Sequence, residues 1–388
     1  MIIPGPAAAG VAGRPIAPPE RPRRRNPDLA GIGMPAREAI DAGTLPCAVI
    51  GVSDAWGTLH LQALAGPADT PSVDSRFFLA SVTKPIVATA VMQLVDEGRL
   101  GLHEPLVGLI PELKGVTWRE RISAWHVLTH TAGLSDLPPK ELARQRPSYD
   151  RMLAKVCAEI PSWEPGTRFR YCSDSFYLLA EAISRLTGMP FPVALRRRVL
   201  DPLGMDATTF DVRPDRANAL PVKGVPMGNI VVRELILRFL ASAALPGGGL
   251  FGTAEDLLRF GRAMLPRRGQ DGPRIVSQAR IDEMLREQTQ GIPETREDGT
   301  IRDPHYALGW RKRSDRSSGR LDDGFDAALV IPASPSTATH GGASGTRLWV
   351  DPERDLVFVF LSNVWYGDDA PSHAVLRRIY AAWDADGA

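Results

Sequence analysis

Residues 77–106, FFLASVTKPIVATAVMQLVDEGRLGLHEPL, decide the fold and carry the first candidate for chemistry. The apolar run FFLA leads directly into Ser81-Val82-Thr83-Lys84, and from residue 81 to about residue 100 apolar residues recur at helical spacing. Gly98 follows the last of them, as glycine commonly does where a helix ends. We therefore expect a helix that begins at Ser81 with one apolar face, made of Ile86, Val87, Ala90, Val91, Leu94 and Val95.

The spacing of Ser81 and Lys84 predicts a nucleophile and its base. A serine hydroxyl attacks a carbonyl well only when a neighbouring group removes its proton. Residues three apart lie on the same helix face, so an unprotonated Lys84 amine could take that proton. A serine at a helix start also lies where backbone N–H groups stabilise developing negative charge. The chain has only six lysines and no other Ser-x-x-Lys, although an N-cap serine followed by a solvent-facing lysine would give the same pattern.

The bulk composition is that of an ordinary soluble globular protein. The 388 residues are 44% hydrophobic and 23% charged. With 46 basic and 45 acidic residues the net charge is +1, which leaves no basic excess to hold a phosphate backbone, so we expect no nucleic-acid partner. No apolar run approaches the roughly 18 residues of a membrane helix. The sequence gives no indication of an oligomeric state.

The N-terminal residues 1–28 predict a flexible tail on a cytoplasmic protein. They are rich in Pro, Gly and Ala, and their arginine cluster comes late, which reverses the order of a signal peptide. The three cysteines are too few and too scattered for a disulfide framework and suit a reducing compartment. An unusual export signal is the alternative reading of this segment.

The remaining pattern predicts an α/β (α+β) fold whose sheet is built from both ends of the chain. Residues 46–66 and 346–363 each contain two β-rich runs around a polar turn, and a final helix is expected over 372–384. Helical patterns dominate between residues 81 and about 205. We expect an antiparallel sheet flanked by helices, with an inserted, mainly helical lobe.

This alternation also predicts the domain boundaries, since a chain of this length commonly divides into two lobes. Residues 29–80 and 240–388 would form the α/β lobe, and residues 81–239 the mainly helical lobe. Loops as long as the predicted ones are often walls of a substrate site. They are expected at 135–148, 214–230, 289–304 and 313–339.

Two further motifs supply candidates for the rest of a site. Tyr171, in WEPGTRFRYCS at 163–173, could pass a proton between Ser81, Lys84 and a leaving group. A half-buried core tyrosine is the alternative to this second motif.

The third motif, His340-Gly341-Gly342-Ala343, precedes a predicted strand. Its glycines would let a backbone edge approach a ligand, and the N–H of the next residue could point into an oxyanion site. A simple turn is the alternative there.

In their order and contexts, the three motifs resemble those of the penicillin-recognising serine hydrolases, in the branch of class C β-lactamases, D-amino-acid-peptidases and family VIII carboxylesterases. The resemblance covers about residues 30–385 and includes LTHTAGL (128–134), DPLGMDATTF (201–210) and YALGW (306–310). It implies a β-lactamase/transpeptidase-like fold, a small-molecule ester or amide substrate, and no cofactor or metal. The residues it implies are Ser81 as nucleophile, Lys84 as base, Tyr171 as second proton-transfer group, the N–H groups of Ser81 and Ala343 as oxyanion hole, and Ser173, His340, Gly341 and Gly342 as substrate-binding residues.

Two departures from the family pattern favour esters over β-lactams and D-Ala-D-Ala peptides. The family's second motif usually reads Tyr-x-Asn, and here its third place is Ser173, which has no amide. In β-lactamases the third motif usually begins with a lysine that faces the substrate carboxylate, and here it begins with His340, which is mostly neutral. We expect a carboxylesterase of small esters. The alternatives are a D-peptidase or D-amino-acid amidase, a weak β-lactamase, an acyltransferase, or a non-enzymatic binding protein of the same fold.

Other patterns carry less weight. His126 and His130 have the i, i+4 spacing of zinc ligands, but the Glu of H-E-x-x-H and a third ligand are missing. Cys172 could itself be a nucleophile, although an inert buried thiol is commoner. The turn PGGGLFG (246–252) lacks the Lys-Ser/Thr of a phosphate loop. No G-x-S-x-G occurs, which argues against an α/β-hydrolase triad.

Overall fold

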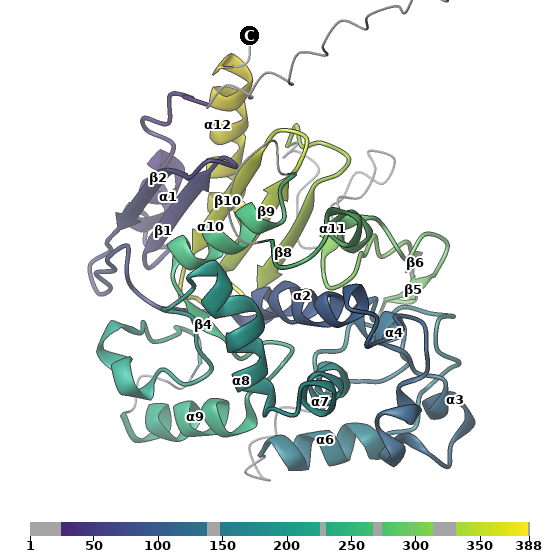
Figure 1. Ribbon diagram of the computed structural model, residues 1–388. Helices are drawn as coiled ribbons and strands as arrows, with labels where there is room; N and C mark the ends of the chain where they lie inside the picture. The colour runs from purple at the N-terminus through teal and green to yellow at the C-terminus, as the bar shows by residue number, and fades with distance from the viewer. Residues whose placement is uncertain are drawn as a thin grey trace, which may run out of the picture.

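A six-stranded antiparallel sheet forms the centre of the computed structural model, which describes residues 25–137, 148–225, 230–266, 274–296, 298–312 and 331–386 (Figure 1). The strand order is β2-β1-β10-β9-β8-β7. Because β1 pairs with β10, the two ends of the chain meet in the middle of the sheet, and the predicted fold class is confirmed. The strands are β1 (Ala48–Ser53), β2 (Thr58–Leu64), β7 (Arg311–Lys312), β8 (Ala338–Gly342), β9 (Thr346–Asp351) and β10 (Leu356–Leu361).

Both predicted hairpins are present, as β1-β2 and β9-β10. Successive strand residues point to opposite faces of a sheet. Ile50 of β1 and Phe358 of β10 accordingly belong to one core, while their neighbours Val49 and Val359 belong to the other. Both faces are therefore covered, which explains why these strands are apolar throughout rather than alternately polar.

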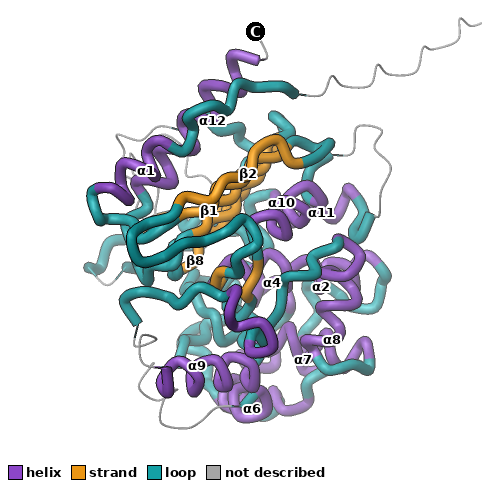
Figure 2. Tube along the Cα trace, turned by 90° about the vertical axis from the view of Figure 1, so that its left-hand side faces the viewer, coloured by secondary structure: helices purple, strands orange, loops and turns teal. Residues whose placement is uncertain are grey.

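Helices cover the two faces of the sheet (Figures 1 and 2). The helices α1 (Met34–Asp41) and α12 (Ala370–Asp386) pack together over one face, and α12 confirms the predicted final helix. The helix α10 (Ala254–Ala263) lies against β1 and β10 on the other face. A Cβ at Gly261 of α10 would lie 2.4 Å from Val357 Cγ1, so this glycine permits the close approach of helix and sheet.

The nucleophile segment forms a 3-10 turn, η1 (Ala80–Val82), that continues into α2 (Thr83–Asp96). The expectation of a single apolar face is wrong, because every residue from Thr83 to Val95 is buried. The helix lies below the sheet in Figure 1, and the helices α7 (Phe176–Thr187) and α11 (Gln278–Leu285) contact it. Polar residues of the helix find partners inside this packing: Thr89 donates to the Pro85 carbonyl at 2.9 Å, and Gln93 Nε2 donates to the Arg198 carbonyl at 2.8 Å.

The remaining elements are short or lie around the helical side. Two small two-stranded sheets are β3 (Phe77–Phe78) with β4 (Phe251–Gly252), and β5 (Glu294–Thr295) with β6 (Ile301–Arg302); the second is a hairpin in the predicted loop 289–304. Much of the predicted loops 135–148 and 313–339, and residues 1–24 of the predicted tail, fall outside the described residues. The division into lobes stays a prediction. The other helices are α3 (Thr117–Glu120), α4 (Ala124–Leu128), α6 (Tyr149–Ala158), α8 (Phe191–Leu195) and α9 (Ile230–Ala243).

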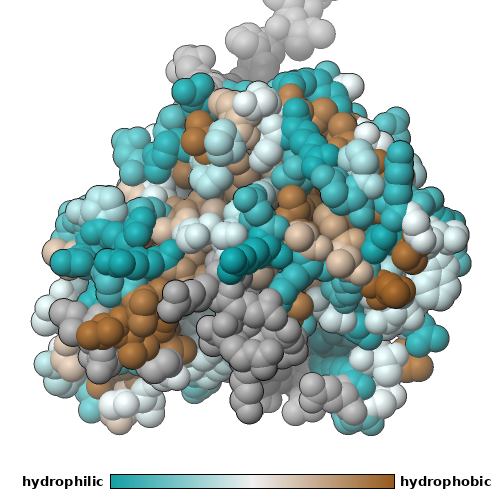
Figure 3. Space-filling model, turned by 90° about the horizontal axis from the view of Figure 1, so that it is seen from below, coloured by the Kyte–Doolittle hydropathy of each residue, from teal (hydrophilic) through white to brown (hydrophobic). Residues whose placement is uncertain are grey.

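The helix α9 is not predicted by the sequence pattern. Its apolar residues are distributed around the helix: Leu237 and Leu240 are buried, while Val231 and Leu235 are 65% and 62% exposed. Such a distribution gives no clear apolar face for a periodicity argument. On its lower side the molecule carries separate apolar patches among polar side chains (Figure 3). In the part of the chain that the structure describes, no helix is both long and apolar enough to cross a membrane.

The packing of α12 on the sheet can be tested with a pair of identical substitutions. Leu376 of α12 is fully buried, so Leu376→Ala should lower the free energy of unfolding by about 2–5 kcal/mol. The control is Leu235→Ala, at an exposed position of α9, which should change the free energy of unfolding by less than about 0.5 kcal/mol. Urea unfolding followed by circular dichroism measures both. Equal effects would contradict the packing of α12.

Candidate functional site

A cavity of about 300 Å³ lies where segments from six parts of the chain meet. Its lining includes four of the residues predicted from the sequence: Ser81, Tyr171, Ser173 and Ala343. Gly247, from the turn that follows α9, also lines it. The volume is at the lower end of the range that holds small-molecule ligands.

Lys84 is fully buried and joins three of these segments. Its Nζ lies 3.3 Å from Ser81 Oγ, 3.0 Å from Ser173 Oγ and 2.6 Å from the Gly247 carbonyl oxygen. The same Nζ lies 4.5 Å from the centre of the Tyr171 ring. The structure therefore brings the first and second motifs together around one amine.

The turn that carries Ser81 is held in a strained conformation. Ala80, the residue before it, has a φ of +46°, in the left-handed region that costs a side-chain-bearing residue roughly 1–2 kcal/mol. Hydrogen bonds fix the residue on its other side: Leu79 N–H donates to the Leu250 carbonyl at 2.8 Å, and Thr346 Oγ1 donates to the Leu79 carbonyl at 2.9 Å. These contacts with neighbouring segments stabilise the strained turn and hold Ser81 in the lining of the cavity.

The third motif packs directly against this turn. A Cβ at Gly342 would lie 2.4 Å from the Leu79 carbonyl oxygen, so only glycine permits this approach of β8. Across the described ranges, neither the Ser81 N–H nor the Ala343 N–H donates a hydrogen bond to another residue. Two unpaired N–H groups beside one cavity are what an oxyanion hole requires.

Gly247 is a site residue that the sequence reasoning missed. Its carbonyl accepts from Lys84, and a Cβ there would lie 2.4 Å from the Ser173 carbonyl oxygen. The available signal was the triple glycine of residues 247–249, which is no phosphate loop but does mark a close approach of two backbone segments.

The structure does not bring His340 to the cavity lining. Its imidazole is buried, with Nε2 2.9 Å from the Tyr306 hydroxyl and Nδ1 2.9 Å from the Gly341 carbonyl oxygen. Tyr306 in turn lies 3.1 Å from Nε2 of His130. Burial, together with the Lys84 charge, lowers the pKa of both His130 and His340 well below the ordinary 6.5. Two neutral histidines and a tyrosine therefore lie behind the site.

The polar wall of the cavity is acidic. Asp136 Oδ1 accepts hydrogen bonds from the backbone N–H groups of Ser173, at 2.6 Å, and Asp174, at 2.9 Å. Burial, with the nearby Asp136 charge, raises the pKa of Asp174 to about 6. Among the described residues no Arg, Lys or His lines the cavity.

The remaining candidates for chemistry have structural explanations. Burial raises the pKa of the Cys172 thiol well above its ordinary value, which argues against a thiolate nucleophile. Nδ1 of His126 accepts from the Ser123 N–H in a helix cap.

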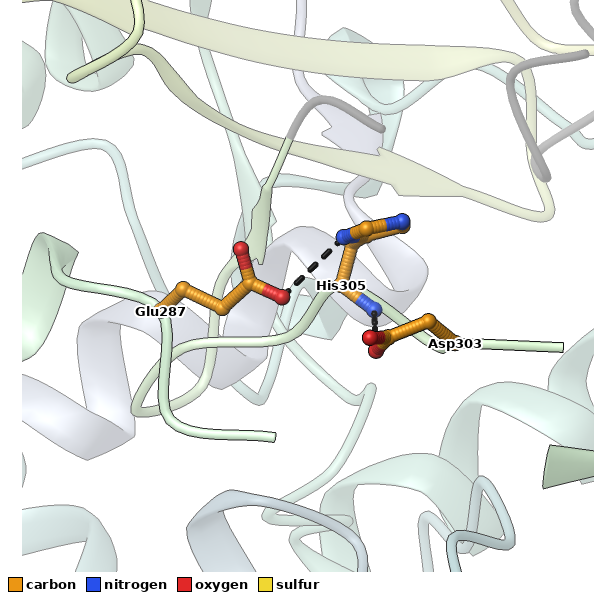
Figure 4. Close-up of side chains that lie close together, drawn as sticks. All are labelled: Glu287, Asp303 and His305. Atoms are coloured by element: carbon orange, nitrogen blue, oxygen red, sulfur yellow. Dashed lines mark hydrogen bonds and ion pairs between the residues drawn. The ribbon is translucent and has the colours of Figure 1, made fainter. Parts of the chain in front are cut away.

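One group of metal-ligand side chains lies close together in the described part of the chain: Glu287, Asp303 and His305, with ligand atoms within 4.8 Å of one another (Figure 4). His305 Nδ1 lies 3.0 Å from Glu287 Oε1, and a hydrogen bond accounts for this contact without a metal.

The chain is similar to known proteins over most of its length. The family model described as beta-lactamase matches residues 37–382. Protein Rv1367c of Mycobacterium tuberculosis (strain ATCC 25618 / H37Rv) is 29% identical over 86% of this chain and 90% of its own length. Esterase EstB of Burkholderia gladioli is 29% identical over 79% of this chain and 83% of its own. These matches confirm the resemblance inferred from the motifs.

A solved structure shows the same fold. EstCE1, described as a hydrolase with promiscuous acyltransferase activity, superposes with a TM-score of 0.71 at 22% identity. The alignment covers 91% of this chain and 98% of that one.

The contact of Gly342 with Leu79 predicts that Gly342→Ala damages the site. The added Cβ meets a backbone carbonyl that cannot rotate away, so the free energy of unfolding should fall by about 1–3 kcal/mol. Displacing the Ala343 N–H should slow labelling of Ser81 by a fluorophosphonate by about 10²–10³-fold. Gly341→Ala is the matched control, because the nearest atom to its Cβ lies 3.7 Å away. Unchanged labelling in Gly342→Ala would contradict the proposed contact.

Proposed function

Because the chain belongs to the β-lactamase family, we propose that it hydrolyses small carboxylic esters through an acyl-enzyme on Ser81. The observation that carries this proposal is the buried Lys84 Nζ, 3.3 Å from Ser81 Oγ beside the cavity. No other amine is hydrogen-bonded to a cavity-lining serine in the described residues. The esterase among the relatives supports the same reaction.

The partners of Lys84 are consistent with a role as base. The Gly247 carbonyl can only accept a hydrogen bond, so one N–H of the amine is directed to it at 2.6 Å. Ser173 Oγ, at 3.0 Å, can accept a second. When the amine is unprotonated it has only two N–H groups, so its lone pair is then left to face Ser81 Oγ and take the hydroxyl proton.

The reaction then follows in two steps. Ser81 Oγ attacks the ester carbonyl while its proton passes to Lys84, and the N–H groups of Ser81 and Ala343 stabilise the oxyanion. Tyr171, whose ring contacts Lys84, relays a proton to the departing alcohol as the C–O bond breaks. Water next attacks the acyl-enzyme, gives up its proton to the same groups, and releases the carboxylic acid and Ser81.

The charges around the cavity favour an ester over a β-lactam or a peptide with a free carboxylate. An anionic substrate would need a cation at the place where β-lactamases usually have lysine, and His340 is neutral and bonded to Tyr306. The side chains of Asp136 and Asp174 line the cavity instead. Ser173, in place of the usual Asn, bonds to Lys84 and has no amide to offer a substrate.

Removing the nucleophile tests the acyl-enzyme. Ser81→Ala should abolish turnover of p-nitrophenyl butyrate and the mass increase after fluorophosphonate treatment, because it removes the hydroxyl that is proposed to form the acyl-enzyme beside Lys84. Ser184→Ala on α7, with its hydroxyl on the Ala180 carbonyl, is the matched control and should keep both. In the wild type, the kcat/KM for nitrocefin should be about 10–100-fold lower than that for the ester. This factor corresponds to the loss of one charge-assisted hydrogen bond between a cation and the substrate carboxylate. Full activity in Ser81→Ala would refute the proposal.

Acyl transfer to an alcohol is a second candidate, favoured by the aromatic wall of the cavity. Phe78 and Trp365 stack with ring centroids 6.4 Å apart, and Tyr366 beside them is 79% exposed. Aromatic side chains of this kind hold an organic acceptor well and exclude water.

A competing alcohol distinguishes the two reactions. If the aromatic wall binds an acceptor, benzyl alcohol should increase nitrophenol release and yield benzyl butyrate, detected by chromatography. Trp365→Ala should reduce the share of ester product without reducing the nitrophenol released in water alone. Butyric acid as the sole product at every alcohol concentration would restrict the protein to hydrolysis.

A further inference from the structure

A buried hydrogen-bond chain joins the second motif to the third. It begins at the Cys172 backbone N–H, 3.1 Å from His130 Nδ1, and continues from His130 Nε2 to the Tyr306 hydroxyl at 3.1 Å. The Tyr306 hydroxyl lies 2.9 Å from His340 Nε2, and His340 Nδ1 lies 2.9 Å from the Gly341 carbonyl oxygen. The three side chains are at most 1% exposed.

The two backbone ends determine the position of every proton in the chain. The Cys172 N–H can only donate, so His130 Nδ1 carries no proton and a neutral His130 has its proton on Nε2. That proton is donated to the Tyr306 oxygen, whose own hydrogen must therefore go to His340 Nε2. His340 then has its proton on Nδ1, which donates to the Gly341 carbonyl, a group that can only accept. All donors and acceptors are matched.

The chain is neutral as well as complete. Burial, together with the Lys84 and Arg311 charges, lowers the pKa of both imidazoles well below 6.5. Burial raises the pKa of the Tyr306 hydroxyl well above 10.0. A charged member would disrupt the donor and acceptor order, so these residues act as a fixed structural link and do not relay catalytic protons.

Both ends of the chain reach groups with a proposed role in the reaction. The His130 ring packs on the Tyr171 ring with centroids 4.3 Å apart, and His130 bonds to the residue that follows Tyr171. The other end holds Gly341, two residues before Ala343. His130 also has a φ of +56°, a strained value for a residue with a side chain, which a fixed set of contacts must maintain.

We propose that Tyr306 is a positioning residue, which through His130 and His340 sets the position of Tyr171 relative to the Ala343 N–H. The inference rests on the proposed roles of those two groups. Tyr306 does not line the cavity and contacts no reacting atom. The hydroxyl matters because its oxygen is the one atom of the chain that both accepts and donates, whereas each imidazole uses a different nitrogen for each role.

Long-range ¹H–¹⁵N NMR of the wild-type imidazoles tests the chain without any assay of activity. At neutral pH, His130 should be the neutral Nε2–H tautomer and His340 the neutral Nδ1–H tautomer. Tyr306→Phe assigns the signals, because it removes a hydrogen bond from only these two rings among the described histidines. A charged imidazole, or the opposite tautomer at either residue, would overturn the proposal even if the protein proves inactive on esters.

Kinetics of Tyr306→Phe test the positioning role. Loss of the link should lower kcat for p-nitrophenyl butyrate by about 10–100-fold, as a small misplacement of reacting groups does, with a much smaller change in KM. The matched control is Tyr380→Phe on α12, which removes a buried hydroxyl bonded to Asp351 and Trp349 on the other face of the sheet. It should lower Tm and leave kcat unchanged. Equal kcat losses in the two variants, or none in Tyr306→Phe, would contradict the proposal.

A second pair of variants keeps the test decisive if Tyr306→Phe does not fold. In His340→Gln the amide oxygen can still accept the Tyr306 proton, whereas His340→Leu leaves that hydroxyl without an acceptor. His340→Gln should retain more of the wild-type kcat. Equal kcat values for these two variants would show that the link to the third motif does not position the site. If the wild type itself releases no nitrophenol, the proposed function fails and the NMR result still decides the chain.

Discussion

The burial of one amine is the constraint on which the active-site region depends. Lys84 has no exposed surface, and a buried polar group without hydrogen-bond partners would cost several kcal/mol. Its partners are Ser81, Ser173 and Gly247, which lie 3, 89 and 163 residues away along the chain. The three hydrogen bonds of the Lys84 amine can therefore form only where the start of α2, the segment before α7 and the glycine turn after α9 meet.

The sheet supplies the other half of this arrangement. The β8-β9 turn bonds to the segment before the nucleophile, through Ser344 to the Phe78 carbonyl and through Thr346 to the Leu79 carbonyl. These bonds hold Leu79 while Ala80 adopts its left-handed conformation. Helix α2 is buried on all sides, so the turn cannot relax by moving the helix. Glycines at 247 and 342 provide the space in which these backbones approach each other.

The features of the fold and of the site that the sequence predicts are those that depend on local patterns. The two hairpins, the final helix and the Ser81–Lys84 spacing depend on residues close in sequence, and each is visible as a periodicity or a short motif. The full burial of α2 depends on what packs around it, which periodicity does not record. Tyr306 bonds to residues 176 and 34 positions away, so no local pattern could reveal its role, although YALGW marked its position. The spacing of His130 from His126 favours a packing and hydrogen-bonding residue over a metal ligand, but no local pattern shows which residues it bonds to.

The exchange of lysine for histidine at the third motif has consequences for both charge and packing. A lysine at position 340 would carry a charge that requires a partner, and the side chains that act electrostatically on this position are themselves basic, Arg311 and Arg347 among them. A neutral imidazole can instead be buried, with one nitrogen accepting from Tyr306 and the other donating to Gly341. The same change therefore removes a cation that could hold a substrate carboxylate and adds a rigid connection behind the site. On this view, selectivity for uncharged acyl groups and the rigidity of the third motif have a common origin in His340.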